Sequence, residues 1–332
     1  MVKLEKEKYL LMDYYILDLV NKKIYLYDMD VRDSLIDILS NIKDIKINKV
    51  GMEKIVNITY DEDKIITFVL NKLNRIVRID AVSLEDIPDY FLHNNEYLEI
   101  INLGSVGRIG DDFLYSNKVL RDININNVRE IGNYFLYHNL ELESLDISKC
   151  VKVGYYFMLK NKKLMNIKGY SLEEIGKKFL FHNMGIEELY LPNLEVVSDY
   201  FLYRNNFLRV LSIPNVKKIG SHVLYLNTCL KELDALNVFE IGDHFLFSNF
   251  DMREIILPKT IYIGDHFMPK NVWLSKIIMD NVREVGHYFL TNNLSLEKVS
   301  IRDDLKYGHY FLKSNSKCEI NKVFDKEGVI KK

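Results

Sequence analysis

The sequence predicts a solenoid, a fold in which short coils of the chain stack one on another in a single row. The string Phe-Leu-aromatic-x-Asn, or a close variant of it, recurs every 22 residues from Phe91 to Phe311, with no insertion or deletion. An asparagine stands four residues after the start of all eleven copies, and a glycine stands three residues before the start of nine. One repeat of this length cannot bury its apolar face alone, so the repeats must stack on their neighbours.

The composition suits such a fold and removes some classes of function. Of the 332 residues, 48% are hydrophobic, which is enough for a large core. The 45 basic and 47 acidic residues leave a formal charge of -2, so no overall charge attracts nucleic acid or an anionic membrane. No run of about 18 uncharged apolar residues predicts a transmembrane helix.

Each coil is expected to contain one short strand and one short helical turn. In the copy that begins at Phe135, the residues Leu142, Leu145 and Ile147 follow as L-x-x-L-x-I. This alternation predicts a strand with Leu145 and Ile147 facing inward. The segment between the glycine and the asparagine carries apolar residues at neighbouring positions, which predicts a helical turn on the opposite, convex side.

The repeated glycine and asparagine are interpreted as structural. Nine of the fifteen glycines stand in one column, which indicates a position that needs either a positive φ or a close approach to the next coil. The asparagine column predicts a ladder in which each side chain pairs with backbone groups of its own coil or a neighbouring one. The members of this asparagine ladder are Asn95, Asn117, Asn139, Asn161, Asn183, Asn205, Asn227, Asn249, Asn271, Asn293 and Asn315.

Residues 1–68 do not keep the period and are expected to form a small α+β cap. The open end of a solenoid exposes an apolar cross-section, which a cap covers. Residues 69–87 fit the strand half of a repeat, but Leu73 stands at the asparagine position, so they form a degenerate first coil. The pattern of the cap predicts a hairpin of residues 14–17 and 24–27, a helix from about Val31 to Ile42, and a second hairpin of residues 54–58 and 65–68 across residues 61–63.

The repeat also resembles a known family. With L-x-x-L-x-L, then often Pro-Asn as in Leu191-Pro192-Asn193, then I-G-x-x-F-L-x-x-N-x-x-L, the chain resembles the BspA-like (Treponema pallidum-type) leucine-rich repeats. The resemblance covers residues 69–324 and implies a leucine-rich-repeat solenoid of the α/β type, followed by a polar tail at residues 325–332. It implies a role in binding and brings no catalytic residues with it.

Cysteine usage and the start of the chain bear on its location. The three cysteines, Cys150, Cys229 and Cys318, suggest neither a disulfide framework nor a zinc pair, so we expect small thiols in a reducing compartment. Alternating acidic and basic residues near the N-terminus argue against a signal peptide. We therefore expect a cytoplasmic protein, with export by a non-classical route as the alternative.

One column of the repeat is a candidate metal site. His222, His244 and His266 stand directly before the start of three successive copies, roughly 5 Å apart, with Asp243 and Asp265 beside them. Six other copies carry tyrosine there, and both residue types offer an apolar body with a polar tip. We therefore expect a structural column, no metal and no cofactor, and keep the metal site as an alternative. The chain has no P-loop, no G-x-S-x-G and no H-E-x-x-H motif.

The outward side of the strands is the better candidate for a binding site. Side chains between the inward residues of each strand are expected to point onto a concave surface. In the later coils they mix aromatic, aliphatic and charged groups, as protein interfaces do. The patch is acidic until Lys276, which favours a basic protein or peptide over nucleic acid. The candidate partner-binding residues are Glu188, Tyr190, Val210, Glu232, Asp234, Glu254, Ile256, Lys276 and Ile278.

The leading functional hypothesis is a non-enzymatic module that binds a protein through the concave strand face. One alternative is a surface or secreted adhesin or effector that is exported without a visible signal peptide. Another is a hydrolase or metal site on the cap or the histidine column.

Overall fold

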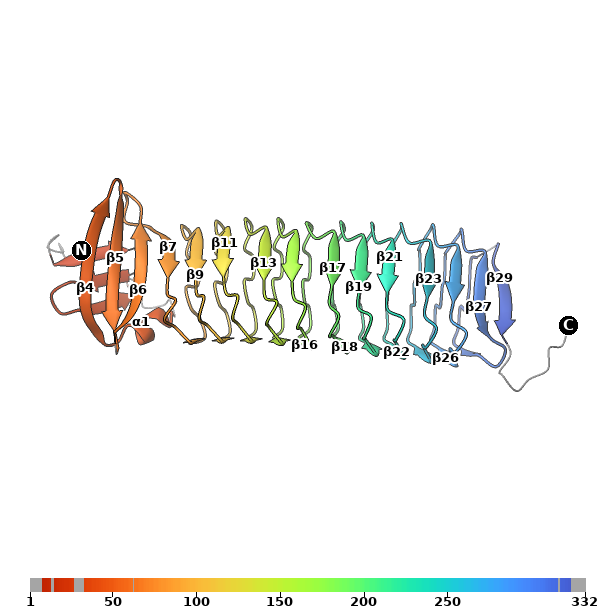
Figure 1. The fold of residues 1–332 in the computed structure, drawn as a ribbon. Coiled ribbons are helices and arrows are strands. Elements are labelled where there is room, and N and C mark those ends of the chain that lie inside the picture. Colours follow the sequence, from red (N-terminus) through yellow and green to blue (C-terminus); the bar gives the residue numbers. More distant parts are fainter. Residues whose placement is uncertain (1–7, 13–14, 27–32, 62, 316, 324–332) are drawn as a thin grey trace.

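The computed structural model describes residues 8–12, 15–26, 33–61, 63–315 and 317–323 of the chain. Figure 1 shows an elongated molecule whose coils follow one another in a nearly straight row, from antiparallel strands near the N-terminus to the last coil. The predicted polar tail, residues 325–332, lies outside the described residues.

The predicted strand is present in each coil and is three residues long in most of them. In β13 (Ser144–Asp146), Leu145 is buried while Ser144 and Asp146 face outward. This strand pairs in parallel with the strand of the next coil, Leu145 opposite Ile167. We call the outward surface of this series the strand face. Its other members are β9 (Ile100–Asn102), β11 (Asp122–Asn124), β15 (Asn166–Lys168), β17 (Glu188–Tyr190), β19 (Val210–Ser212), β21 (Glu232–Asp234), β23 (Glu254–Ile256), β25 (Lys276–Ile278), β27 (Lys298–Arg302) and β29 (Glu319–Val323).

Each coil also contains a second strand of two residues, which the sequence analysis missed. In β12 (Glu130–Ile131), Ile131 is buried and Glu130 is exposed, and the strand pairs in parallel with both neighbours. Two residues are too few to show an alternating pattern, so the sequence carries no signal for them. The other two-residue strands are β8 (Asp86–Ile87), β10 (Arg108–Ile109), β14 (Lys152–Val153), β16 (Glu174–Ile175), β18 (Val196–Val197), β20 (Lys218–Ile219), β22 (Glu240–Ile241), β24 (Tyr262–Ile263), β26 (Glu284–Val285) and β28 (Lys306–Tyr307).

The helical turn predicted between the glycine and the asparagine is wrong. In this segment every second residue is left-handed, for example Tyr134 (φ 53°), Leu136 (φ 49°) and His138 (φ 58°). Their N–H groups donate to other coils, Tyr134 and His138 to the next one and Leu136 to the previous one, over 2.9 to 3.0 Å. A helix would form these bonds within one coil, whereas the alternating conformation forms them between coils. The bonds offset the roughly 1–2 kcal/mol that each left-handed residue costs.

The glycine column is explained by close approach and not by a positive φ. Among the described glycines only Gly51 has a positive φ. A Cβ built on Gly242 would lie 2.8 Å from the backbone carbon of Gly220 in the previous coil. A side chain at this position would therefore push two coils apart.

The buried asparagines form the ladder that their repetition predicts. The side-chain amide of Asn161 donates to the carbonyl of Leu136 in the previous coil over 2.8 Å, and its oxygen accepts the backbone N–H of Asn139 over 3.0 Å. The amides of Asn117, Asn139, Asn205 and Asn249 donate in the same way, but their side-chain oxygens have no partner in the described structure. The first member differs further, because neither side-chain polar atom of Asn95 has one. The residue 25 positions earlier, Leu70, belongs to an antiparallel strand and not to a coil.

The phenylalanines stack through the core. Phe135 and Phe157 are both fully buried, and their nearly parallel rings lie 5.2 Å apart between centroids. The stack continues through most coils and is interrupted where Val223 takes the phenylalanine position.

The N-terminal region departs from prediction mainly in its helix. Among the described residues, the helix expected from Val31 to Ile42 is reduced to α1 (Leu35–Ile38). Residues expected near its end begin β4 (Ile42–Val50), which pairs antiparallel with β5 (Glu53–Tyr60). Apolar and polar residues alternate from Ile45 to Ile47, which favours a strand. This preference prevails over the helical spacing of the residues before it. Tyr14, Tyr27, Val31 and Glu62 lie outside the described residues.

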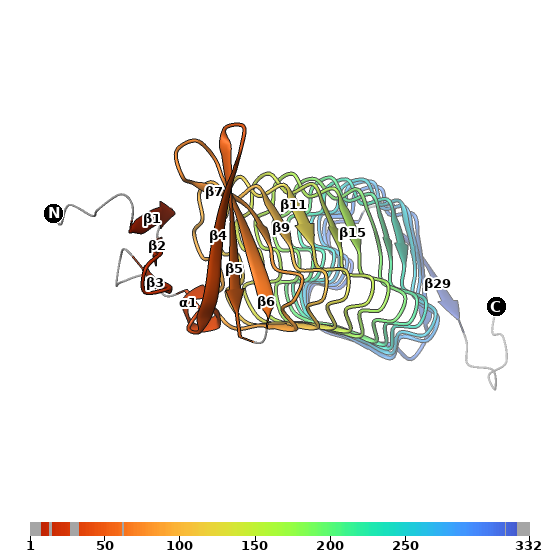
Figure 2. The same cartoon turned by 60° about the vertical axis from the view of Figure 1, so that its left-hand side comes forward.

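The two predicted hairpins are present. The second consists of β5 and β6 (Lys64–Leu70), with Ile58 opposite Ile66. The first consists of β2 (Tyr15–Asp18) and β3 (Lys23–Leu26), preceded by β1 (Tyr9–Met12). In Figure 2, β4 to β6 lie across the end of the coil stack, with β1 to β3 beside them.

The antiparallel strands join the strand series of the coils. Strand β7 (Ile76–Asp80) pairs antiparallel with β6 on one side and parallel with β9 on the other. One sheet therefore runs from the N-terminal region into the first coils, and buried residues from β1 to the last coils form one continuous core. Within the described chain, no helix is both long and apolar enough to cross a membrane.

Candidate functional site

The nine candidate residues all lie on the strand face. Strands β17, β19 and β21 pair in register, so that Glu188, Val210 and Glu232 form one row. In the neighbouring sheet, Ile256 of β23 lies opposite Ile278 of β25. The apolar candidates are unequally accessible: Tyr190 is 49% exposed and Ile256 is 40% exposed, whereas Val210 and Ile278 are half-buried. Tyr190 and Ile256 are therefore the accessible apolar groups among the nine.

The patch is acidic on balance. Lys276 is engaged with Glu254, with 2.5 Å between Nζ and Oε1. The hydroxyl of Ser212 donates to Asp234 over 2.9 Å, which leaves the charge of that carboxylate in place. Glu188 and Glu232 are exposed. The nine candidates thus carry four carboxylates against one lysine, which gives this part of the strand face a negative field that complements a basic partner.

A hollow at the edge of the strand face contains a residue that the sequence analysis missed. The hollow, of about 320 Å³, lies where β21 and β23 belong to different sheets. Trp273 lines it and is 58% exposed. Exposed tryptophan is enriched among residues that dominate binding energy. The available signal was that this is the only tryptophan of the chain, six residues after the start of its copy. The other residues lining the hollow are Lys231, Glu232, Asp251 and Arg253.

The histidine column is a stack of rings. His222 and His244 lie 4.4 Å apart between ring centroids, and His244 and His266 lie 4.6 Å apart, all nearly parallel. Tyr200 and Tyr288 continue the stack at both ends. Burial, and then the two neighbouring imidazoles, lower the pKa of His244. This arrangement is that of rings packed face to face, and it favours a structural column over a set of metal ligands.

The carboxylates beside these histidines are occupied by the backbone. Asp243 accepts the backbone N–H of Asp265 over 2.8 Å, and Asp265 accepts that of His287 over 2.6 Å. This is a further ladder that the sequence analysis missed, although a short polar residue directly follows the glycine in several copies, including Asp111 and Asn133. In the described part of the chain, no group of three His, Cys, Asp or Glu is placed to hold a metal ion.

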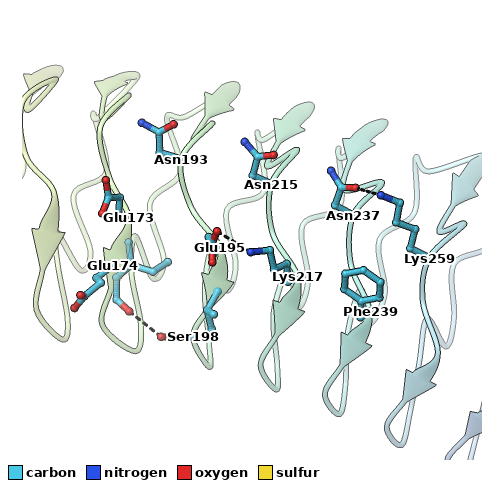
Figure 3. Close-up of a pocket in the computed structure, with 12 residues that line it drawn as sticks. Glu173, Glu174, Asn193, Glu195, Ser198, Asn215, Lys217, Asn237, Phe239 and Lys259 are labelled. Atoms are coloured by element: carbon cyan, nitrogen blue, oxygen red, sulfur yellow. Dashed lines mark hydrogen bonds and ion pairs between the residues drawn. The ribbon is translucent and has the colours of Figure 1, made fainter.

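A second hollow lies on the side of the coils that carries the two-residue strands. Figure 3 shows Asn193, Asn215 and Asn237 in an even row beside it, with Lys217 and Glu195 joined below them. The amide groups of this row donate to carbonyls of the preceding coil, for example Asn215 to Pro192 over 2.8 Å. Lys217 pairs with Glu195 over 2.7 Å. Much of the polar surface of this second hollow is thus paired within the chain.

The geometry defines a class of protein: a repeat scaffold with a regular core and variable outward columns. The model of a protein family described as "BspA type Leucine rich repeat region" matches residues 85–209 and 196–319, in six copies. The chain therefore belongs to the BspA-type leucine-rich-repeat family.

The chain is similar to a leucine-rich repeat protein from Bacteroides ovatus, at 15% identity and a TM-score of 0.31. The similarity covers 81% of this chain and 98% of that one. No curated protein matches the chain.

Proposed function

We propose that the protein is a non-enzymatic interaction module that binds a protein or peptide partner through the strand face. The observation that carries this proposal is the combination of exposed apolar side chains with an excess of carboxylates on one ordered surface. Tyr190 and Ile256 supply the apolar contacts, and Trp273 adds a third anchor at the hollow.

The charge of the surface suggests the chemistry of the partner. Glu188, Glu232 and Asp234 lie on strands that pair in register, so their carboxylates are held at the spacing of neighbouring strands. A basic segment of a protein complements this arrangement, and its binding should weaken as salt increases. Phosphate groups of a nucleic acid would be repelled.

The test is capture of a partner by wild-type protein and by the double variant Tyr190→Glu, Ile256→Glu. Both positions are exposed, so the variant should remain folded and lose the partner. The matched control is Tyr155→Glu, Tyr262→Glu, which changes two exposed tyrosines away from the strand face and should retain the partner. Equal capture by both variants and wild type would rule out the strand face.

We propose a cytoplasmic location, with an adhesin or effector exported by a non-classical route as the alternative. Fractionation of the native cell separates the two. Protein recovered with the cell surface or in the medium, with a cytoplasmic marker retained inside, would favour the second.

A further inference from the structure

A cluster of basic side chains lies on another side of the coils, outside the strand face. His138, Lys160, His182 and Arg204 occupy the same position, directly before the ladder asparagine, in four successive coils. Lys118 and Lys162 directly follow the ladder asparagines Asn117 and Asn161 of the coils on either side of His138. Burial first, and then Lys118, Lys160 and Lys162, lower the pKa of His138. Lys160, Lys162 and Arg204 act in the same way on His182. We call these six residues the basic row.

The basic row lacks internal neutralisation. Lys118, Lys160, Lys162 and Arg204 are exposed, and among the described residues none of the four forms an ion pair. This contrasts with the many lysines elsewhere that pair with a carboxylate one coil away, such as Lys152 with Glu174 and Lys217 with Glu195. In a chain with a formal charge of -2, the row is a local positive field that is open to an anionic partner.

The aromatic side chains beside the row exclude one class of anion. Tyr115 and Tyr137 stack on each other at 4.5 Å, and Phe181, Tyr203 and Tyr225 stack at 4.7 and 4.8 Å. Proteins that bind single-stranded nucleic acid use free aromatic faces on which bases stack. Within each stack the ring faces are covered by the neighbouring rings. Leu159 separates the two stacks, and Lys160 lies over the ring of Tyr137 and Lys178 over that of Phe181, each 6.0 Å from the centroid. The row therefore offers charge with no open series of stacking faces.

The spacing of the row favours a helical partner. The neighbouring rings show that the row advances about 4.5 to 4.8 Å per coil. An acidic stripe on an α-helix presents roughly one carboxylate per 5.4 Å turn, whereas an extended strand presents one per ~6.7 Å on the same side. Over the three steps from His138 to Arg204, a helix drifts out of register by about 2 Å, and a strand by about 6 Å. Flexible Lys and Arg side chains can absorb the first mismatch only. The cations at these positions are Lys160 and Arg204. The two histidines, whose pKa is lowered, offer a carboxylate an imidazole N–H.

We propose that the basic row is a second docking surface, which binds an α-helix with a stripe of carboxylates along the coil axis. It is separate from the strand face, opposite in charge, and does not rest on the function proposed for that face. A chain with both surfaces can bring together a basic and an acidic partner.

The experiment measures binding of two labelled alanine-based helical peptides by fluorescence anisotropy at low ionic strength. One peptide carries four Glu residues in a stripe, and the other carries the same four Glu distributed around the helix. The striped peptide should bind about tenfold more tightly, because only it aligns its carboxylates with the row.

Two charge variants localise the binding. The test variant is Lys118→Gln, Lys160→Asn, Lys162→Gln, Arg204→Asn. Asparagine is chosen at Lys160 (φ 63°) and Arg204 (φ 58°) because it tolerates the left-handed conformation. The control removes four lysines from the side of the two-residue strands: Lys152→Gln, Lys217→Gln, Lys218→Gln, Lys306→Gln. The test variant should lose the striped peptide and the control should keep it.

Several outcomes would overturn the proposal. Equal binding of the two peptides would reduce the row to a non-specific positive patch. Tighter binding of a single-stranded oligothymidylate than of the striped peptide would assign it to nucleic acid. Self-association of the wild type that the test variant abolishes would assign it to a second copy of the chain.

Discussion

At the residue scale, the asparagine ladder connects neighbouring coils through buried backbone groups. Asn183 donates its side-chain amide to the carbonyl of Met158 over 2.8 Å, and its oxygen accepts the N–H of Asn161 over 2.7 Å. The side chain of Asn183 is fully buried, so water does not replace its hydrogen bonds when the side chain is removed.

Replacement of Asn183 by alanine should therefore lower the free energy of unfolding by on the order of 1 to 3 kcal/mol for each group left unpaired. Urea denaturation measures this. The matched control is Asn193→Ala, because Asn193 also donates to a carbonyl of the preceding coil, that of Tyr170, but on the exposed surface. A loss for Asn183→Ala no larger than for the control would contradict a stabilising ladder.

Asp33 gives the N-terminal region a pH dependence. Burial raises the pKa of this carboxyl to about 6, against the opposing effect of its bond from the Tyr15 hydroxyl over 2.5 Å. The folded chain then binds a proton more tightly than the unfolded chain. The contribution of Asp33 to stability should rise as the pH falls through 6 towards the unfolded pKa, by up to about 3 kcal/mol.

Comparison with Asp33→Asn isolates this effect from other carboxylates. The unfolding free energy of wild type minus that of the variant should increase between pH 7 and pH 4.5. A difference that stays constant, or that decreases on acidification, would show that Asp33 is not protonated preferentially in the folded chain.

At the element scale, the sequence predicted what repeats and missed what is short or conformationally unusual. Inward residues such as Leu145 alternate, so the long strand series could be read directly. The segment from Tyr134 to His138 gave a false helical signal, because burial of adjacent apolar residues also arises from alternating left- and right-handed backbone. No propensity rule anticipates left-handed Tyr and Leu, since intercoil hydrogen bonds select that conformation.

The glycine column tests how tightly the coils approach. In Gly242→Ala the added methyl group would meet backbone atoms of Gly220 and Ser221 at 2.8 to 2.9 Å, so the variant should lose about 1 to 3 kcal/mol or more. In the control Gly104→Ala, the nearest atoms are side-chain atoms at 3.6 Å, and little loss is expected. Thermal unfolding of both variants decides the point, and equal melting temperatures would contradict the close-approach explanation.

At the scale of the whole molecule, different side chains of each coil hold the fold and face a partner. Inward columns repeat because each coil must fit the next, while outward columns are free to vary. The candidate residues of the strand face could be placed from the sequence because a strand alternates strictly. Trp273, the ladder that includes Asp243 and Asp265, and the basic row each leave a signal in the sequence. Their roles could not be predicted from it, since these depend on which side of a coil each turn presents.

If the strand face binds the partner, hydrogen exchange of the protein alone and with its captured partner should show where the complex forms. We expect protection on binding to be concentrated in β17 to β25 and in the turn that contains Trp273. Protection that instead falls on the histidine column or the N-terminal strands, with β17 to β25 unchanged, would contradict it.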